Sequence, residues 1–172
     1  MKHRLALRKN RITISHRMNF GKLTIFVGLP GAGKTTEIKK IRPSITGLCI
    51  EDFHDKAFGD SPAVEHSKHY RALIEALRAG HDCAIADIRF CEPQGRTNLE
   101  QAIYQEISTV CMEWKFFEND YAKCEKNIHF RSPQTPEPAL AKLKEFAPKY
   151  VIPDGATTIP IWPEKYIHDR VN

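Results

Sequence analysis

A glycine-rich segment, Gly28-Leu29-Pro30-Gly31-Ala32-Gly33-Lys34-Thr35, most constrains how this chain can fold. It follows the apolar run Leu23–Val27, which is typical of a buried strand, and it leads into a helix that begins at Lys34. A strand that turns through glycines into a helix brings several backbone N–H groups together, where they suit a phosphate. A plain strand-to-helix turn is the alternative, but the complete GxxxxGK[ST] pattern in this context favours nucleotide binding.

Each position of this loop has an expected role in holding ATP and Mg²⁺. Lys34 can reach the β and γ phosphates, and the Thr35 hydroxyl can ligate magnesium. Thr36, one residue further into the helix, can donate to the α phosphate. Glycine is required where side chains would block the backbone or where φ is positive. The remaining positions expected to bind the nucleotide are Gly28, Pro30, Gly31, Ala32 and Gly33.

Apolar runs of strand length alternate with helix-like segments along the chain. The runs are Leu23–Val27, 47–50, 83–86, 109–117 and 157–161. The expected helices begin at Lys34, near Ser61-Pro62 and near Arg96, and span about 120–130 and 136–149. This alternation predicts one α/β domain over residues 18–172, with helices on both faces of a largely parallel sheet.

Two acidic residues directly follow apolar runs, at the edge of the sheet where ligands bind in open α/β folds. Asp87 ends Cys83-Ala84-Ile85-Ala86-Asp87 and is expected to support magnesium, with an exposed strand-end aspartate as the alternative. Asp52 follows the second run and is expected to accept the proton of an attacking hydroxyl. Glu51 and Asp55 compete for that role, and a solvated acidic turn is the alternative.

Three arginines are candidates to neutralise the charge of a transferred phosphoryl group. Arg89 lies two residues after Asp87, and Arg96 opens the helix that follows. Arg131 precedes a stretch with three prolines, and residues 120–138 are therefore expected to form a lid. A surface position is the alternative for each arginine. The histidines pair with no nucleophile at a recognisable spacing, so we expect surface or substrate-edge positions for His54, His66, His69 and His129.

The net charge of +5 comes from the N-terminal tail. Residues 1–17 hold six Lys or Arg and no acid, whereas the rest has 20 basic and 21 acidic residues. We expect the tail to be disordered and the near-neutral body to be a weak match for nucleic acid. No stretch approaches the ~18 apolar residues of a membrane span. The five cysteines are odd in number and lack CxxC spacing, which favours a reduced, cytoplasmic protein.

From Leu23 to Arg131 the pattern resembles the small P-loop kinases of the adenylate-kinase-like group, in particular the polynucleotide kinase and zeta-toxin branch. Asp52 matches the acid that follows the second strand in that branch. The branch has Asp-x-Thr at the third strand and an arginine nine residues after the aspartate. Asp87 and Arg96 match, and Arg89 replaces the threonine. Lys126-Asn127-Ile128-His129-Phe130-Arg131 is similar to its arginine-rich lid helix.

This resemblance implies a P-loop NTPase fold, with five strands in the order 2-3-1-4-5 and the loop strand in the middle. It also implies transfer of the γ phosphate of ATP to a hydroxyl acceptor. A nucleotide-dependent switch that hydrolyses ATP slowly and acts through a protein partner is the alternative. A kinase of nucleic-acid 5′ ends would need a basic groove beside Asp52. The acids in Glu51-Asp52-Phe53-His54-Asp55 weigh against it.

Overall fold

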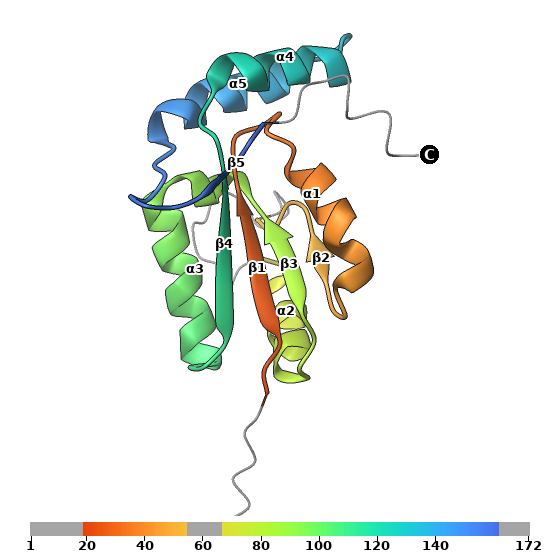
Figure 1. Ribbon diagram of the computed structural model, residues 1–172, viewed down its shortest axis with the longest axis vertical. Helices are drawn as coiled ribbons and strands as arrows, with labels where there is room; N and C mark the ends of the chain where they lie inside the picture. Colours follow the sequence, from red (N-terminus) through yellow and green to blue (C-terminus); the bar gives the residue numbers. More distant parts are fainter. Residues whose placement is uncertain (1–18, 55–66, 162–172) are drawn as a thin grey trace, which may run out of the picture.

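The computed structural model describes residues 19–54 and 67–161. Five strands form one sheet with every neighbouring pair parallel, in the order β2-β3-β1-β4-β5 (Figure 1). The predicted α/β class and strand order are confirmed. The strands are β1 (Lys22–Val27), β2 (Cys49–Ile50), β3 (Cys83–Ala86), β4 (Cys111–Phe117) and β5 (Thr158–Ile159).

Helices flank the sheet, and two of them lie beyond the carboxyl ends of the central strands (Figure 1). The α-helices are α1 (Lys34–Ile41), α2 (Tyr70–Arg78), α3 (Pro93–Glu106), α4 (Tyr121–Arg131) and α5 (Glu137–Phe146). The 3₁₀ helices are η1 (Arg42–Ser44), η4 (Ile88–Cys91) and η5 (Ala147–Lys149). In Figure 1, α4 and α5 lie above the sheet and α2 lies behind β1 and β3. None of the described helices has the length and apolar character needed to cross a bilayer.

The central position of β1 follows from its composition. Five of its six residues are buried, as are all four of β3, because a strand with neighbours on both edges and helices on its faces has no solvated side. Leu23 pairs in register with Cys83 of β3 and Met112 of β4. This register places the carboxyl ends of β1, β3 and β4 at one edge of the sheet, where ligands bind in this class of fold.

Some predicted boundaries are wrong. Residues 67–69 are not helical and α2 begins at Tyr70, so the helix does not run on from a start near Ser61-Pro62. That predicted start lies outside the described residues, as does the tail 1–17. The helix near Arg96 begins earlier, at Pro93, because proline suits the first helical turn. The start of α4 agrees within one residue, since the Asp120 side chain accepts a hydrogen bond from the Lys123 N–H and caps the helix.

Tyr150 fastens the carboxyl ends of the two central strands. Its buried hydroxyl lies 3.0 Å from the Val27 carbonyl oxygen of β1 and 2.6 Å from that of Phe117 in β4. Burial raises the pKa of this hydroxyl, so it stays a hydrogen-bond donor at all ordinary pH values. The segment after η5 is thereby held against the end of β1 at which the glycine-rich loop starts.

Replacing Tyr150 with Phe should lower the free energy of unfolding by about 1 kcal/mol, because two buried carbonyl oxygens lose their shared donor. Urea unfolding followed by fluorescence measures the change. The matched control is Tyr104→Phe at an exposed tyrosine, which should alter stability by less than about 0.5 kcal/mol. Equal effects of the two variants would show that the Tyr150 hydroxyl does not fasten the strands.

Candidate functional site

The glycine-rich loop is shaped by two kinds of constraint. Gly31 and Gly33 have φ of 83° and 107°, the left-handed region that favours glycine, as the sequence predicts for some loop positions. Gly28 is required for a different reason, because a Cβ there would lie 3.0 Å from the Phe117 side chain. At Gly31 a Cβ would also lie 2.4 Å from the Cys124 carbonyl oxygen. The loop is therefore packed directly against β4 and α4.

Lys34 folds back over the loop. Its Nζ donates hydrogen bonds to the carbonyl oxygens of Gly28, at 2.6 Å, and Leu29, at 3.0 Å. Burial lowers the pKa of Lys34, while the negative charge of Asp87 acts in the opposite direction. The Lys34 ammonium therefore lies over the turn of the loop, where phosphate oxygens can replace the carbonyl oxygens as its partners.

A cavity of about 390 Å³ opens on one side of this loop. We call it the loop cavity; it is lined by Pro30, Gly31, Gly33, Lys34, Thr35, Thr36, Lys39, Lys40, Asn127 and Arg131. Four of these side chains are cationic and none is acidic. The cavity unites most of the predicted nucleotide-binding residues with the predicted lid arginine, Arg131. Gly28 and Ala32 lie outside the lining, and Ala32 is buried in the core.

Helix α4 is fastened to the loop by Asn127, a residue that the sequence reasoning missed. The buried Asn127 side chain donates a hydrogen bond from Nδ2 to the Gly31 carbonyl oxygen, at 2.9 Å. Asn127 follows the core position Cys124 by three residues and directly precedes the buried Ile128. A polar residue beside these apolar positions was the feature of the sequence that could have indicated a buried, hydrogen-bonded side chain. Arg131, the last residue of α4, reaches the loop cavity because of this attachment.

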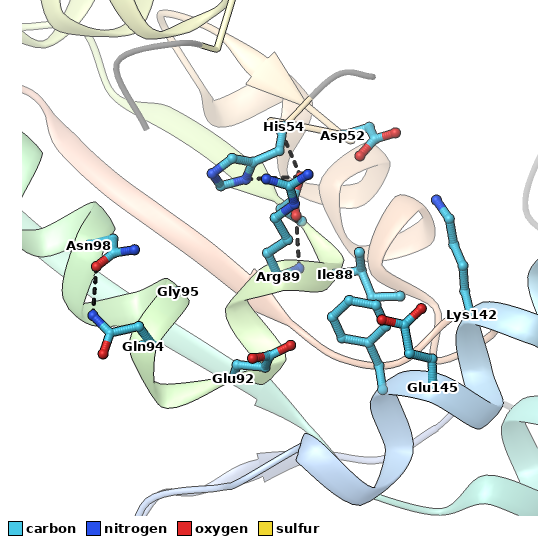
Figure 2. Close-up of a pocket in the computed structure, with 12 residues that line it drawn as sticks. Asp52, His54, Ile88, Arg89, Glu92, Gln94, Gly95, Asn98, Lys142 and Glu145 are labelled. Atoms are coloured by element: carbon cyan, nitrogen blue, oxygen red, sulfur yellow. Dashed lines mark hydrogen bonds and ion pairs between the residues drawn. The ribbon is translucent and has the colours of Figure 1, made fainter. Parts of the chain in front are cut away.

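A second cavity, of about 400 Å³, contains both acids predicted at the strand ends (Figure 2). We call it the carboxylate cavity; it is lined by Asp52, His54, Asp87, Ile88, Arg89, Glu92, Gln94, Gly95, Asn98, Lys142, Glu145 and Phe146. Asp52 is exposed on its wall. The structure thus brings Asp52, Asp87 and Arg89 together, from three positions that are up to 37 residues apart in the sequence.

Asp87 is buried, with a relative exposure of 1%, so the alternative of an exposed strand-end aspartate is wrong. Its carboxylate accepts hydrogen bonds from the backbone N–H of His54, at 2.6 Å, and of Arg89, at 2.8 Å. Burial alone would raise the pKa of Asp87, but the hydrogen bonds and charge of His54, together with the Arg89 N–H, outweigh it and lower the pKa. Asp87 therefore stays ionised and ties the segment after β2 to η4.

A surface or substrate-edge position was expected for His54; the surface position is wrong, because His54 lies against Asp87 in the lining of the carboxylate cavity. Its side chain is 7% exposed, and its Nδ1 lies 3.3 Å from Oδ2 of Asp87. The ring makes edge contacts with Phe53 and Phe90, with centroids 5.3 and 5.6 Å away. The polar sequence around His54 hides this burial, because Asp87 and Phe90 lie more than 30 residues further along the chain.

Arg96 lines neither cavity. Its guanidinium donates hydrogen bonds to the carbonyl oxygens of Phe90, at 2.8 Å, and Cys91, at 3.2 Å, and lies 5.4 Å from the centroid of the Phe116 ring. These contacts hold η4 in place, which in turn positions Arg89. The predicted role of Arg96 at the substrate has no contact that supports it in this arrangement.

The residues expected to support magnesium fit that ion by their donor chemistry. Mg²⁺ prefers oxygen ligands and takes several of them from water and substrate phosphates, with one or two from the protein. Thr35 offers a hydroxyl, and the ionised Asp87 carboxylate has acceptor capacity beyond its two backbone N–H partners. Among residues 19–54 and 67–161 there is no cluster of three or more His, Cys, Asp or Glu side chains able to hold a metal without phosphate and water.

Comparisons with known proteins support the fold and go no further. No protein-family model matches the sequence, and no curated protein matches it. A solved structure described as the crystal structure of APE1195 is similar, with a TM-score of 0.54 and 15% sequence identity. The match covers 84% of this chain and 86% of that chain. At this identity the likeness concerns the fold alone.

Replacing Asn127 with Ala should weaken ATP binding and lower the free energy of unfolding by about 1–2 kcal/mol, because the Gly31 carbonyl oxygen loses its donor and α4 loses its link to the loop. Calorimetric titration with ATP and urea unfolding measure the two effects. Asn119→Ala is the control, since Asn119 donates to the Tyr150 carbonyl oxygen and lines neither cavity. It should leave ATP affinity unchanged; a parallel loss in both variants would contradict the role given to Asn127.

Proposed function

We propose that this chain is an ATP- and magnesium-dependent phosphotransferase that moves the γ phosphate of ATP to a hydroxyl acceptor. One observation carries the proposal. Lys34 lines the loop cavity and Asp87 lines the carboxylate cavity, and the loop and Asp87 follow paired neighbouring strands, since Phe26 of β1 is in register with Ala86 of β3. A cationic cavity suited to phosphates therefore lies next to a second cavity of similar volume that suits an acceptor.

The loop cavity is where the phosphates of ATP, the phosphoryl donor, would bind. The N–H groups of the loop and of the first turn of α1 bind phosphate oxygens, and Lys34 neutralises charge on the β and γ phosphates. Lys39, Lys40 and Arg131 line the same cavity and add positive charge. Thr35 and Asp87 would hold a magnesium ion, which would supply further neutralisation of the phosphate oxygens when bound. Arg131 at the end of α4 is the candidate to close over the transferred group.

The acceptor side depends on Asp52. Its carboxylate, exposed on the wall of the carboxylate cavity, is available to orient an acceptor hydroxyl and to take its proton as the bond to phosphorus forms. Glu51 is also exposed but does not line this cavity, so of the two adjacent acids Asp52 is the better candidate. Asp55, the other competitor, lies outside the described residues.

The alternative from the sequence, a slow ATPase that acts as a switch, requires only the loop cavity. The carboxylate cavity favours the phosphotransferase, because a switch does not need a second cavity of similar volume beside its phosphate site. Screening γ-labelled ATP against nucleosides, oligonucleotides, sugars and small hydroxyl compounds identifies the acceptor. Consumption of ATP without any labelled product would favour the switch.

Lys34→Ala should lower phosphoryl transfer at least about 100-fold, because a fixed cation aimed at the transferred charge is lost. Transfer is measured with γ-labelled ATP, and thermal unfolding checks that the fold is retained. Lys144→Ala, at an exposed lysine of α5 that lines neither cavity, is the control and should keep full activity. Transfer at the normal rate by Lys34→Ala would refute the assigned site.

Asp52→Asn should lower acceptor-dependent transfer about 100-fold or more while ATP binding is retained, because the amide cannot take the acceptor proton. Glu51→Gln is the matched control, one residue away and outside the cavity, and should change transfer little. Transfer rates are compared with the acceptor found by the screen, and ATP affinity is measured by titration. The switch is favoured instead if Asp52→Asn leaves turnover of ATP unchanged.

A further inference from the structure

Helix α5 supplies one wall of the carboxylate cavity, through Lys142, Glu145 and Phe146. These residues come after Arg131, the end of the region that resembles the P-loop kinases, so that resemblance says nothing about them. Figure 2 shows Lys142 directed from α5 toward the side of the cavity where Asp52 lies, while Gln94 and Asn98 of α3 line the opposite side. An acceptor held at Asp52 is therefore within the space that Lys142 faces.

Most of the acids that line this cavity already have partners of their own. Asp87 accepts two backbone N–H groups, and its Oδ2 lies 3.3 Å from Nδ1 of His54. Glu92, at the start of α3, and Glu145, on α5, both pair with Lys149, whose Nζ lies 3.4 and 3.3 Å from their Oε1 atoms. Lys149 thus joins the α3 and α5 walls and neutralises part of their charge.

Lys142 differs from these groups. It is half-buried, and within residues 19–54 and 67–161 it has neither a hydrogen bond nor an ion pair. Glu145, three residues later on the same helix, is paired with Lys149 instead. A partly desolvated ammonium is stabilised by a negatively charged partner. A ligand that brings such a partner to the cavity therefore binds more tightly than a neutral ligand.

We propose that Lys142 binds an anionic group, a carboxylate or a phosphate, carried by the hydroxyl acceptor; this rests on the phosphotransferase function proposed above. The acceptor is then a small molecule with its hydroxyl at Asp52 and its anionic group at α5. The cavity volume of about 400 Å³ is in the range of small-molecule sites. Lys142 is a specificity residue in this arrangement, because it selects the acceptor without touching the transferred phosphoryl group.

The test uses four probes with the same three-carbon hydroxyl skeleton: glycerol, glycerate, glycerol phosphate and 3-amino-1,2-propanediol. Binding to the full chain, without nucleotide, is measured by calorimetric or NMR titration at low ionic strength. Glycerate or glycerol phosphate should bind about tenfold more tightly than glycerol, and the aminodiol should not. Whichever anion binds more tightly identifies the source of the negative charge.

Three variants assign the effect to Lys142. Lys142→Ala should remove the preference for the anionic probes and leave glycerol binding unchanged, Lys142→Arg should keep the preference, and the control Lys144→Ala should behave as the unaltered protein. The proposal is overturned if both anions bind no more tightly than glycerol, if the aminodiol binds best, or if Lys142→Ala weakens every probe equally. An aminodiol preference would mean that the cavity acids recognise an amine and that Lys142 pairs with Asp52 when a ligand binds.

This experiment can refute the anion site without refuting the proposed function, because it measures binding and not phosphoryl transfer. A protein that shows the Lys142-dependent preference but transfers no phosphate would retain the anion site and refute the phosphotransferase. Transfer of phosphate to a neutral acceptor, with no preference for anionic probes, would support the phosphotransferase and refute the anion site.

Discussion

The buried carboxylate of Asp87 makes the interactions on which the carboxylate cavity depends. It lies directly after β3 and accepts N–H groups from two segments that no strand pairing connects, the loop after β2 and the start of η4. The Phe53 N–H, which donates to the Ala86 carbonyl oxygen at 3.1 Å, adds a link between the segments that follow β2 and β3. Without the Asp87 carboxylate, the part-buried N–H groups of His54 and Arg89 would lose their partner, and Asp52 would be held less firmly relative to β3.

Packing between glycines and their neighbours has the equivalent role at the loop cavity. The α4 backbone approaches the loop so closely that Gly31 has no room for a Cβ, and Asn127 adds a hydrogen bond at the same place. A second close approach, of Gly95 to the Arg89 carbonyl oxygen, fixes α3 against η4. The loop and the predicted lid helix therefore hold each other in place, and so do α3 and the segment that contains Arg89.

The sequence predicts most of the fold because its strongest signals are local. The strand β3 is continuously apolar and β1 is mostly so, the loop pattern is complete, and the strands and the loop lie at the expected residues in the structure. What the sequence misses depends on partners far along the chain. His54 is buried by Asp87 and Phe90, Arg96 is held by the carbonyl oxygens of η4, and the start of α2 is later than its proline suggests. No periodicity or local motif in the sequence indicates those contacts.

The charges of the two cavities follow from this arrangement. The loop cavity takes cations from α1 and α4, whereas the other cavity takes acids from the ends of β2 and β3 and from the α3 and α5 walls. The negative charge of Asp87 opposes the effect of burial on Lys34, so it lowers the electrostatic cost of burying that ammonium. Under the proposed function, a polyphosphate would add negative charge on the Lys34 side, and a divalent cation beside Asp87 would offset it. The two residues would then couple phosphate binding to metal binding.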